Sequence, residues 1–225
     1  VWTHLHIRNG GKGLFLESLN NGGWDRPEYI RSGEQMLELV ELEPFQKGWL
    51  AATWPDQAGF FGDGKCAMAF MGNWMYGAQA SNSASGEGLG DSNMGMFNMP
   101  MTNGGLGDSG DTLGGINGWL FSSSASDAAV ELMMHYISLD IQKEDASNGA
   151  YIPIVKGADG SLTNPFLQQV AKNISSSEYH QIFYDQFLGA DIGRVVNDVS
   201  TDLAAGIISA EEATQAVQEA WEFNQ

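Results

Sequence analysis

The chain has 225 residues, of which 43% are hydrophobic, and its 28 acidic against 10 basic side chains give a formal net charge of −18. This is the composition of a folded protein, with enough residues for one large domain or two small ones. So acidic a surface repels phosphate groups, which argues against nucleic acids and anionic membrane surfaces as partners. No apolar run is long enough to cross a bilayer, so no direct membrane insertion is expected.

The first fifty residues are predicted to form short elements separated by glycine-rich turns. Residues 1–8 alternate irregularly and predict a strand, and a short helix is expected over 14–19. The run Asn-Asn-Gly-Gly-Trp at 20–24 predicts a turn. Ser32 and Gln35 have the spacing of a capping box, so a helix is expected to begin there and to end before Pro44.

The stretch 60–80, FFGDGKCAMAFMGNWMYGAQA, predicts a helix end, a glycine turn, a short apolar strand and a second helix opened by Gly72-Asn73-Trp74. This order places the Trp74 ring at the end of a buried strand and beside a helix N-terminus, where open α/β sheets bind ligands. Tryptophan is usually a core residue. Because Trp74 and Trp119 both lie close to glycines at predicted element ends, the core and ligand-binding interpretations stay equally open.

The second half changes from mixed structure to helices. Strands are predicted over 94–99 and 114–121, with a glycine- and aspartate-rich loop between them, and 149–153 reads as extended. Apolar residues recur at helical spacing from Val130, and helices are expected over 166–174 and 192–203. A capping box at Ser209 and Glu212 predicts the last helix. The pattern is α/β first and all-α last, and so few strands indicate that partner strands are missing.

Short motifs for other chemistry are weak. Gly-Asp-Ser-Gly at 107–110 matches the nucleophile turn of trypsin-like proteases, but that fold is all-β, so a loop is favoured. Asp108 and Asp111 lack the rest of a calcium loop. His4 and His6 would share one face of a strand, as zinc ligands can, yet ordinary surface or satisfied histidines are favoured. No metal site and no cofactor is therefore expected.

Four stretches, in the same order, resemble the family 1 extracellular solute-binding proteins of ABC sugar importers, the maltose-binding-protein-like group. They are Phe61-x-x-Gly64-Lys65-x-Ala67-Met68-x-x-x-Gly72-x-Trp74, residues 97–100, the segment from Leu113-Gly114-Gly115 through Trp119 to Ser123, and residues 149–153. The tail over 189–220 is similar to the closing helices of that family and leans toward its α-glucoside-type oligosaccharide binders.

The resemblance implies an α/β fold of the periplasmic-binding-protein-like type II, with one lobe incomplete and a helical C-terminal part. Residues 1–112 would form the second lobe, 113–164 would return to the first lobe, and 165–225 would be helices packing on the second. Because family members are much longer, an N-terminally incomplete chain is expected.

The function implied is that of a binding subunit, not an enzyme, which captures a sugar or oligosaccharide between its lobes and delivers it to ABC permease subunits. A monomer is implied, periplasmic or extracellular, with a lipid anchor left open for the full-length protein. The ligand-binding residues implied by the resemblance are Trp2, Asn73, Trp74, Gly114, Gly115, Asn117, Trp119, Tyr151 and Asp185.

Two alternatives remain beside this interpretation. A glycoside hydrolase or an accessory carbohydrate-binding domain would also expose aromatic rings, and the hydrolase would need two carboxylates facing each other across a cleft. A peptide- or metal-binding lobe of the same fold would be favoured if His4 and His6 held a metal.

Overall fold

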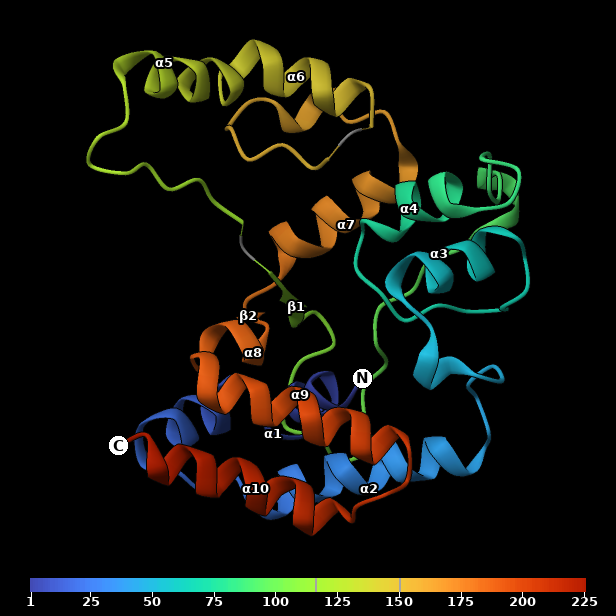
Figure 1. The fold of residues 1–225 in the computed structure, drawn as a ribbon, viewed down its shortest axis with the longest axis vertical. Coiled ribbons are helices and arrows are strands. Elements are labelled where there is room, and N and C mark those ends of the chain that lie inside the picture. The colour runs from blue at the N-terminus through green and yellow to red at the C-terminus, as the bar shows by residue number, and fades with distance from the viewer. Residues whose placement is uncertain (116, 150) are drawn as a thin grey trace. The chain divides into compact units, whose positions relative to one another are not determined.

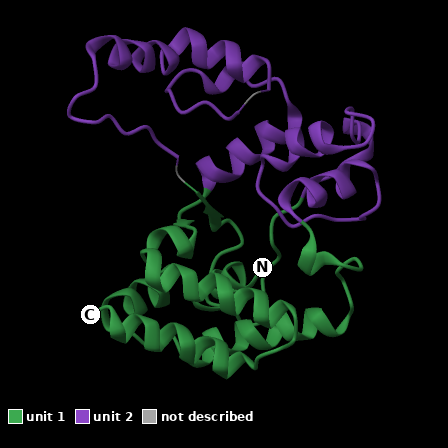
Figure 2. Ribbon diagram, viewed as in Figure 1, with its two compact units in different colours: residues 1–52, 97–115, 177–225 green, residues 53–96, 116–176 purple. Residues whose placement is uncertain are grey.

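The computed structural model describes residues 1–115, 117–149 and 151–225, which divide into two compact units (Figures 1 and 2). Unit 1 comprises residues 1–52, 97–115 and 177–225, and unit 2 comprises residues 53–96 and 116–176. Each unit is therefore assembled from segments that lie far apart in the sequence.

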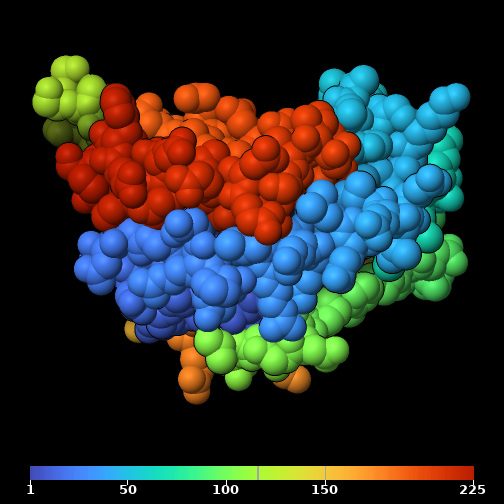
Figure 3. Space-filling model, turned by 90° about the horizontal axis from the view of Figure 1, so that it is seen from below, coloured from blue at the N-terminus to red at the C-terminus, as the bar shows by residue number. Residues whose placement is uncertain are grey.

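Unit 1 is mainly helical. Its helices are α1 (Trp2–Asn21), α2 (Pro27–Glu41), the 3-10 helix η1 (Trp49–Ala51), α8 (Tyr184–Phe187), α9 (Ala190–Ala204) and α10 (Ala210–Phe223). Helix α2 packs against α1, α9 and α10. Figure 3 shows α2 and α10 lying side by side on one face of the molecule.

A short parallel sheet completes unit 1. Strand β1 (Thr112–Gly114) pairs with β2 (His180–Ile182), and Thr112 lies opposite His180. It is the one sheet within the described ranges. The α/β prediction is thus confirmed only in part, because the fold is mostly helical with a small sheet.

The C-terminal helices form as their sequence patterns predict. The Ser209 hydroxyl accepts from the backbone N–H of Glu212 at 3.1 Å, and the Glu212 carboxylate accepts from the N–H of Ser209 at 2.8 Å. This reciprocal cap satisfies two donors that the first turn of α10 leaves unpaired. On α9, Ile192, Val196 and Val199 are buried on one face. Both predicted helices are confirmed.

The core of unit 1 is rich in aromatic rings. Trp24 stacks on Tyr29 with ring centroids 5.5 Å apart, and Phe15 packs against Tyr184 at 5.0 Å. Rings of this size bury more apolar area than any other side chains, so they supply much of the stabilisation of a small helical unit. The buried cluster comprises Trp2, Leu5, Phe15, Trp24, Tyr29, Met36, Tyr184, Ile192, Val196, Val199, Leu203, Ala204, Ala213 and Val217.

The strand prediction for residues 1–8 is wrong, because these residues form the first turns of α1. Five consecutive side chains from Leu5 to Asn9 are buried, so the segment shows no one-sided periodicity. His4 and His6 therefore lie two positions apart on a helix, where side chains do not share a face.

The helix start predicted at Ser32 is also wrong. Helix α2 begins at Pro27, whose fixed φ suits the first helical position and whose missing N–H is not needed there. Ser32 is buried inside the helix, and its hydroxyl donates to the carbonyl of Glu28 at 2.9 Å. The turn predicted at 20–24 is confirmed, with Gly22 and Gly23 at positive φ.

Unit 2 has shorter helices and a smaller core. Its elements are α3 (Trp54–Gly62), α4 (Met75–Asn82), the 3-10 helix η2 (Asp91–Asn93), α5 (Asp127–Tyr136), α6 (Leu139–Ser147), the 3-10 helix η3 (Asp159–Ser161) and α7 (Pro165–Ser176). Helices α3 and α4 approach so closely that a Cβ on Gly62 would lie 2.0 Å from the carbonyl oxygen of Gln79. A small buried cluster consists of Ala146 in α6, Leu162 just after η3 and Leu167 in α7.

The strands predicted in and beside unit 2 are not found. Residues 66–71 and 94–99 are irregular, and of the strand predicted over 114–121 the structure has only Gly114 in β1, with Ile116 outside the described residues. A strand is stable only when a neighbour accepts its backbone hydrogen bonds. These segments have the apolar residues of a strand, but they have no neighbouring strand to pair with in the described ranges.

The compact units group residues 53–96 with 116–176, whereas the lobes implied by the family resemblance have the boundaries 1–112, 113–164 and 165–225. Those lobe boundaries stay a prediction. Within the described part of the chain, no helix combines the length and apolar character needed to cross a membrane.

Candidate functional site

The nine predicted ligand residues are divided between the two units. Unit 2 contains Asn73, Trp74, Asn117, Trp119 and Tyr151, and unit 1 contains Trp2, Gly114, Gly115 and Asp185.

Trp74 lies at the N-terminal end of α4, as predicted, and its side chain is 45% exposed. The turn before the helix is closed by a hydrogen bond from the N–H of Met75 to the carbonyl of Gly72 at 3.0 Å. The indole folds back over Gly72, where a Cβ would lie 2.3 Å from the ring. Asn73, between them, is exposed. An aromatic face and a polar side chain are thus presented together at a helix start.

Asn117 and Trp119 lie in an exposed segment without regular structure, and the Trp119 side chain is 69% exposed. In Figure 1 the segment that follows β1 runs on the opposite side of unit 2 from α4. Trp74 and Trp119 each present an indole to solvent.

Tyr151 is held by two polar side chains of α6. The amide of Gln142 donates to the Tyr151 hydroxyl at 2.6 Å, and this hydroxyl donates to the Asp145 carboxylate. Gln142 also accepts from the N–H of Ile154 at 3.1 Å. Burial first, and then the bond to Asp145, raises the pKa of Tyr151. Tyr151 therefore stays a neutral phenol whose ring is fixed in place.

Gly114 ends β1 and Gly115 follows it at the surface. A Cβ on Gly114 would lie 2.8 Å from the His180 ring, so this strand end accommodates no larger residue without movement. The carbonyl of Gly114 accepts from the N–H of Phe183 at 3.0 Å. Asp185 is exposed on the short helix α8, close in sequence to His180 and Phe183.

Trp2 lies in the core of unit 1 and is 2% exposed, so its ring presents no face to a ligand in this structure. It meets His6 edge-on, with ring centroids 4.4 Å apart. Burial lowers the pKa of His6 to about 3, and neither ring nitrogen has a hydrogen-bond partner among the described residues. The His4/His6 pair shows no metal arrangement, and no group of three metal-ligating side chains occurs in the described ranges.

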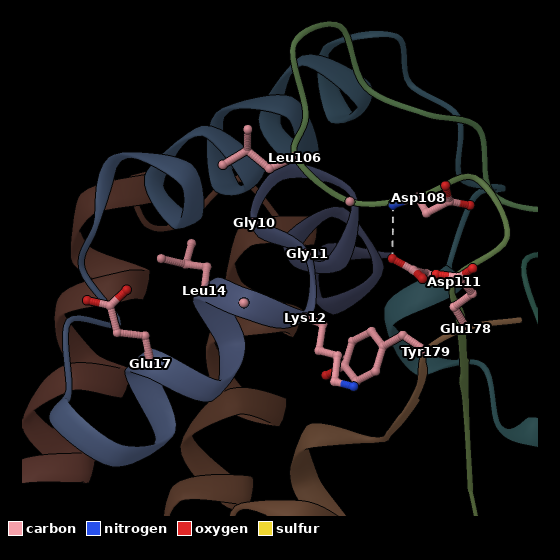
Figure 4. Close-up of a pocket in the computed structure, with 12 residues that line it drawn as sticks. Gly10, Gly11, Lys12, Leu14, Glu17, Leu106, Asp108, Asp111, Glu178 and Tyr179 are labelled. Carbon is pink, nitrogen blue, oxygen red and sulfur yellow. Dashed lines mark hydrogen bonds between the residues drawn. The ribbon is translucent and has the colours of Figure 1, made fainter.

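Unit 1 also contains an open cavity of about 620 Å³ that the sequence analysis did not identify (Figure 4). Its walls are the kink of α1 with residues 10–14, the loop over 106–111, and the pair Glu178–Tyr179 just before β2. At the kink Gly11 has φ 63°, and a Cβ there would lie 3.1 Å from the carbonyl oxygen of Leu106. The hollow is called the glycine cavity below.

Hydrogen bonds from the buried Arg8 side chain of α1 hold the loop wall of the glycine cavity in place. The Arg8 guanidinium donates to the carbonyl oxygens of Met99 at 3.0 and 3.1 Å, Asp108 at 2.8 Å and Asp111 at 3.0 Å. Burial lowers the pKa of Arg8, and the nearby carboxylates of Asp111 and Asp108 oppose this shift. Five donors in a rigid fork suit Arg for binding several carbonyls at once. The loop is therefore pre-organised.

Most carboxylates around the glycine cavity are already engaged. Glu17 pairs with Arg26 at 2.8 Å, and the Asp111 carboxylate accepts from the N–H of Asp108 at 2.9 Å. The Lys12 ammonium lies over the Tyr179 ring, 5.8 Å from its centroid. The surface thus combines a donor, acceptors and an aromatic ring. The glycine clusters NGGKG and GGLGDSG supply much of its wall, but in the sequence they read only as loops.

Comparison with known proteins identifies the fold and no family. No protein-family model matches the chain. No curated protein sequence matches it either.

Among solved structures, the chain superposes with a TM-score of 0.80 and 24% identity on a protein described as "Chitin oligosaccharide binding protein", covering 99% of this chain and 56% of that one. A second structure, from work on xylan utilisation by the thermophilic bacterium Caldanaerobius polysaccharolyticus, has a TM-score of 0.79 and 20% identity, covering 97% of this chain and 56% of that one. The chain therefore shares their fold and spans little more than half of their length.

Proposed function

We propose that this chain is the carbohydrate-binding part of a solute-binding protein that captures a sugar or oligosaccharide. The observation that carries the proposal is the fold shared, over nearly the whole chain, with a protein described as binding chitin oligosaccharides. The exposed indole of Trp74 adds a chemical reason, because aromatic faces pack on the C–H faces of sugar rings.

The finer parts of the proposal rest on the family resemblance. The complete protein would have the periplasmic-binding-protein-like type II fold and would close its lobes on the sugar by hinge bending. It would act outside the cytoplasm as a monomer, without catalysis, and would deliver the sugar to the permease of an ABC importer. The acidic surface, with its net charge of −18, favours a neutral sugar over a phosphorylated one.

Calorimetry tests the proposal directly. The chain is titrated with N,N′-diacetylchitobiose, xylobiose, maltose and trehalose, and intrinsic tryptophan fluorescence is recorded alongside. At least one sugar is expected to bind, and Trp74→Ala is expected to weaken that binding because the stacking face is lost. The matched control is Trp54→Ala, since Trp54 is a 39% exposed indole outside the predicted site.

Two results would count against this function. If no sugar produces heat or a fluorescence change, the binding proposal fails. If an aryl glycoside is cleaved, the protein is a glycoside hydrolase, the alternative left open by the sequence.

A further inference from the structure

We propose that the glycine cavity of unit 1 is a second contact site for a neutral sugar ring, separate from the Trp74 site. The inference deepens the proposed function and rests on it. A volume of about 620 Å³ falls in the range of small-molecule sites. The cavity lies entirely within unit 1, so its geometry belongs to one compact part of the chain.

The cavity is formed by backbone that cannot carry side chains. Gly11, at φ 63° where the α1 helix is interrupted, faces the loop so closely that a Cβ would make a tight contact with it, in a backbone conformation that L side chains rarely adopt. On the loop, a Cβ on Gly107 would lie 2.1 Å from the carbonyl oxygen of Ile7. Larger residues at either position would push the two walls apart. The glycines therefore keep the kink and the loop in backbone contact at the edge of the hollow.

The loop wall does not have to be ordered by a ligand. Besides its bonds to Arg8, the loop donates from the N–H of Leu106 to the carbonyl of Asn9 at 3.0 Å, and from the N–H of Gly107 to the carbonyl of Arg8 at 3.2 Å. The Thr102 hydroxyl donates to the Asn9 amide oxygen at 2.7 Å. A site held in this way spends little binding free energy on ordering.

The polar groups left at the surface suit hydroxyl groups. In Figure 4 the Lys12 side chain lies beside the Tyr179 ring, and Asp111 and Glu178 lie close to that ring. The Lys12 ammonium can donate hydrogen bonds to a ligand. The carboxylate of Glu178, which has no partner in the described part of the chain, can accept hydrogen bonds from a ligand. Leu14 and Leu106 add apolar surface. Sugar hydroxyls are both donors and acceptors on a ring with apolar C–H faces.

Anionic ligands and metal ions do not suit the glycine cavity. An anionic ligand would meet the carboxylates of Asp108 and Glu178 on a chain whose net charge is −18. A metal ion would need converging ligands, and the described residues contain no group of three. A neutral polyhydroxylated ring satisfies the donors and acceptors without either conflict.

Gly13 offers a direct way to block the cavity. It lines the cavity, its φ is not positive, and a Cβ there would meet nothing within 4 Å. Gly13→Phe therefore places a ring in the hollow without straining the backbone. Gly160, in unit 2, is equally unobstructed, so Gly160→Phe is the matched control.

The test is a titration of the ¹⁵N-labelled chain with xylobiose, N,N′-diacetylchitobiose and maltose, followed by NMR. Saturable shifts are expected at the amides of Gly11, Gly13 and Gly107. Gly13→Phe should weaken this binding by about tenfold or more, because the ring occupies the volume of the sugar, whereas Gly160→Phe should not. Lys12→Met should also weaken it, and Lys47→Met, at an exposed site outside the cavity, should not.

The outcomes separate the two proposals. If the sugar shifts the indole resonance of Trp74 and leaves the amide resonances of Gly11, Gly13 and Gly107 unchanged, this inference is overturned and the proposed function is supported. If sugar-induced shifts of the cavity amides are unchanged in Gly13→Phe, the inference is also overturned. Cavity shifts that Gly13→Phe abolishes support it, whether or not the Trp74 indole responds. No shift with any sugar at its solubility limit overturns both.

Discussion

The indole of Trp74 lies against Gly72, so closely that a Cβ on Gly72 would stand 2.3 Å from ring atom Cζ3. The two residues are separated only by Asn73 and lie just before α4. The absence of a side chain on Gly72 is therefore what allows the ring of the best candidate sugar contact to fold back over the turn. The observed position of this ring is therefore incompatible with a Cβ at residue 72.

Gly72→Ala is predicted to displace the Trp74 ring while the chain stays folded. The added methyl cannot be accommodated at 2.3 Å, and the ring, at 45% exposure, has solvent to move into. The measurement is the indole N–H resonance of Trp74 by NMR, together with sugar affinity by calorimetry. Both are expected to change.

The matched control is Gly77→Ala on α4, where a Cβ would meet nothing within 4 Å. It should leave the Trp74 resonance in place and increase helix stability by up to about 1 kcal/mol. An unchanged Trp74 resonance in Gly72→Ala would show that the ring does not depend on this glycine.

Arg8→Met is predicted to destabilise unit 1 strongly. The substitution removes the donors for the carbonyls of Met99, Asp108 and Asp111, of which the bond to Asp111 is buried and the others are partly buried. Each buried group left unsatisfied costs about 1–3 kcal/mol. A loss of roughly 3 kcal/mol or more is expected in the free energy of unfolding, measured by urea denaturation.

The comparison variant for Arg8→Met is Arg194→Met. Arg194 pairs with Asp198 one helical turn away, and both side chains are more than half exposed. Its loss should change stability by about 0.5 kcal/mol or less. Equal effects of the two substitutions would refute the role given to Arg8.

Acidification is predicted to destabilise unit 1 through His6. Burial lowers the pKa of His6 to about 3 in the folded protein, from an ordinary value of 6.5. Between these pH values the unfolded chain binds a proton that the folded chain does not. Stability from this residue therefore falls as the pH is lowered from 6.5 toward 3, by about 1.4 kcal/mol per pH unit.

Urea denaturation at pH 7, 6, 5 and 4 checks this dependence in the parent chain and in His6→Phe. Phenylalanine keeps an aromatic ring against Trp2 and Tyr29 but cannot take up a proton. The stability of the variant should fall less steeply with acid. His4, whose burial lowers its pKa to about 4, remains in both proteins and contributes equally. Parallel curves would contradict the prediction.

Gln142→Leu is predicted to release Tyr151. The leucine leaves the N–H of Ile154 without its acceptor and the Tyr151 hydroxyl without the amide donor, which together cost about 1–3 kcal/mol. Hydrogen exchange at Ile154 should accelerate. Gln169→Leu is the control, because Gln169 is exposed and, among the described residues, bonds only Asn173 on its own helix. Unchanged exchange at Ile154 would argue against the positioning role of Gln142.

The sequence alone determined the elements whose signals are local. The reciprocal cap of Ser209 and Glu212, the apolar spacing along α9 and the positive-φ glycines after α1 involve residues a few positions apart, and the structure has them as predicted. Trp74 at a helix start was predicted for the same reason. These features form from backbone chemistry within one or two turns of chain.

Only the tertiary structure decided the remainder. Residues 2–8 are helical, and the core buries a run of consecutive side chains in that segment, which removes the periodicity that a sequence pattern needs. Residues 66–71 carry a strand-like sequence but remain irregular, because backbone pairing requires a neighbour that no local signal supplies. The glycine cavity depends on contacts such as Arg8 to Asp111, over a hundred positions apart, and so no local pattern could reveal it.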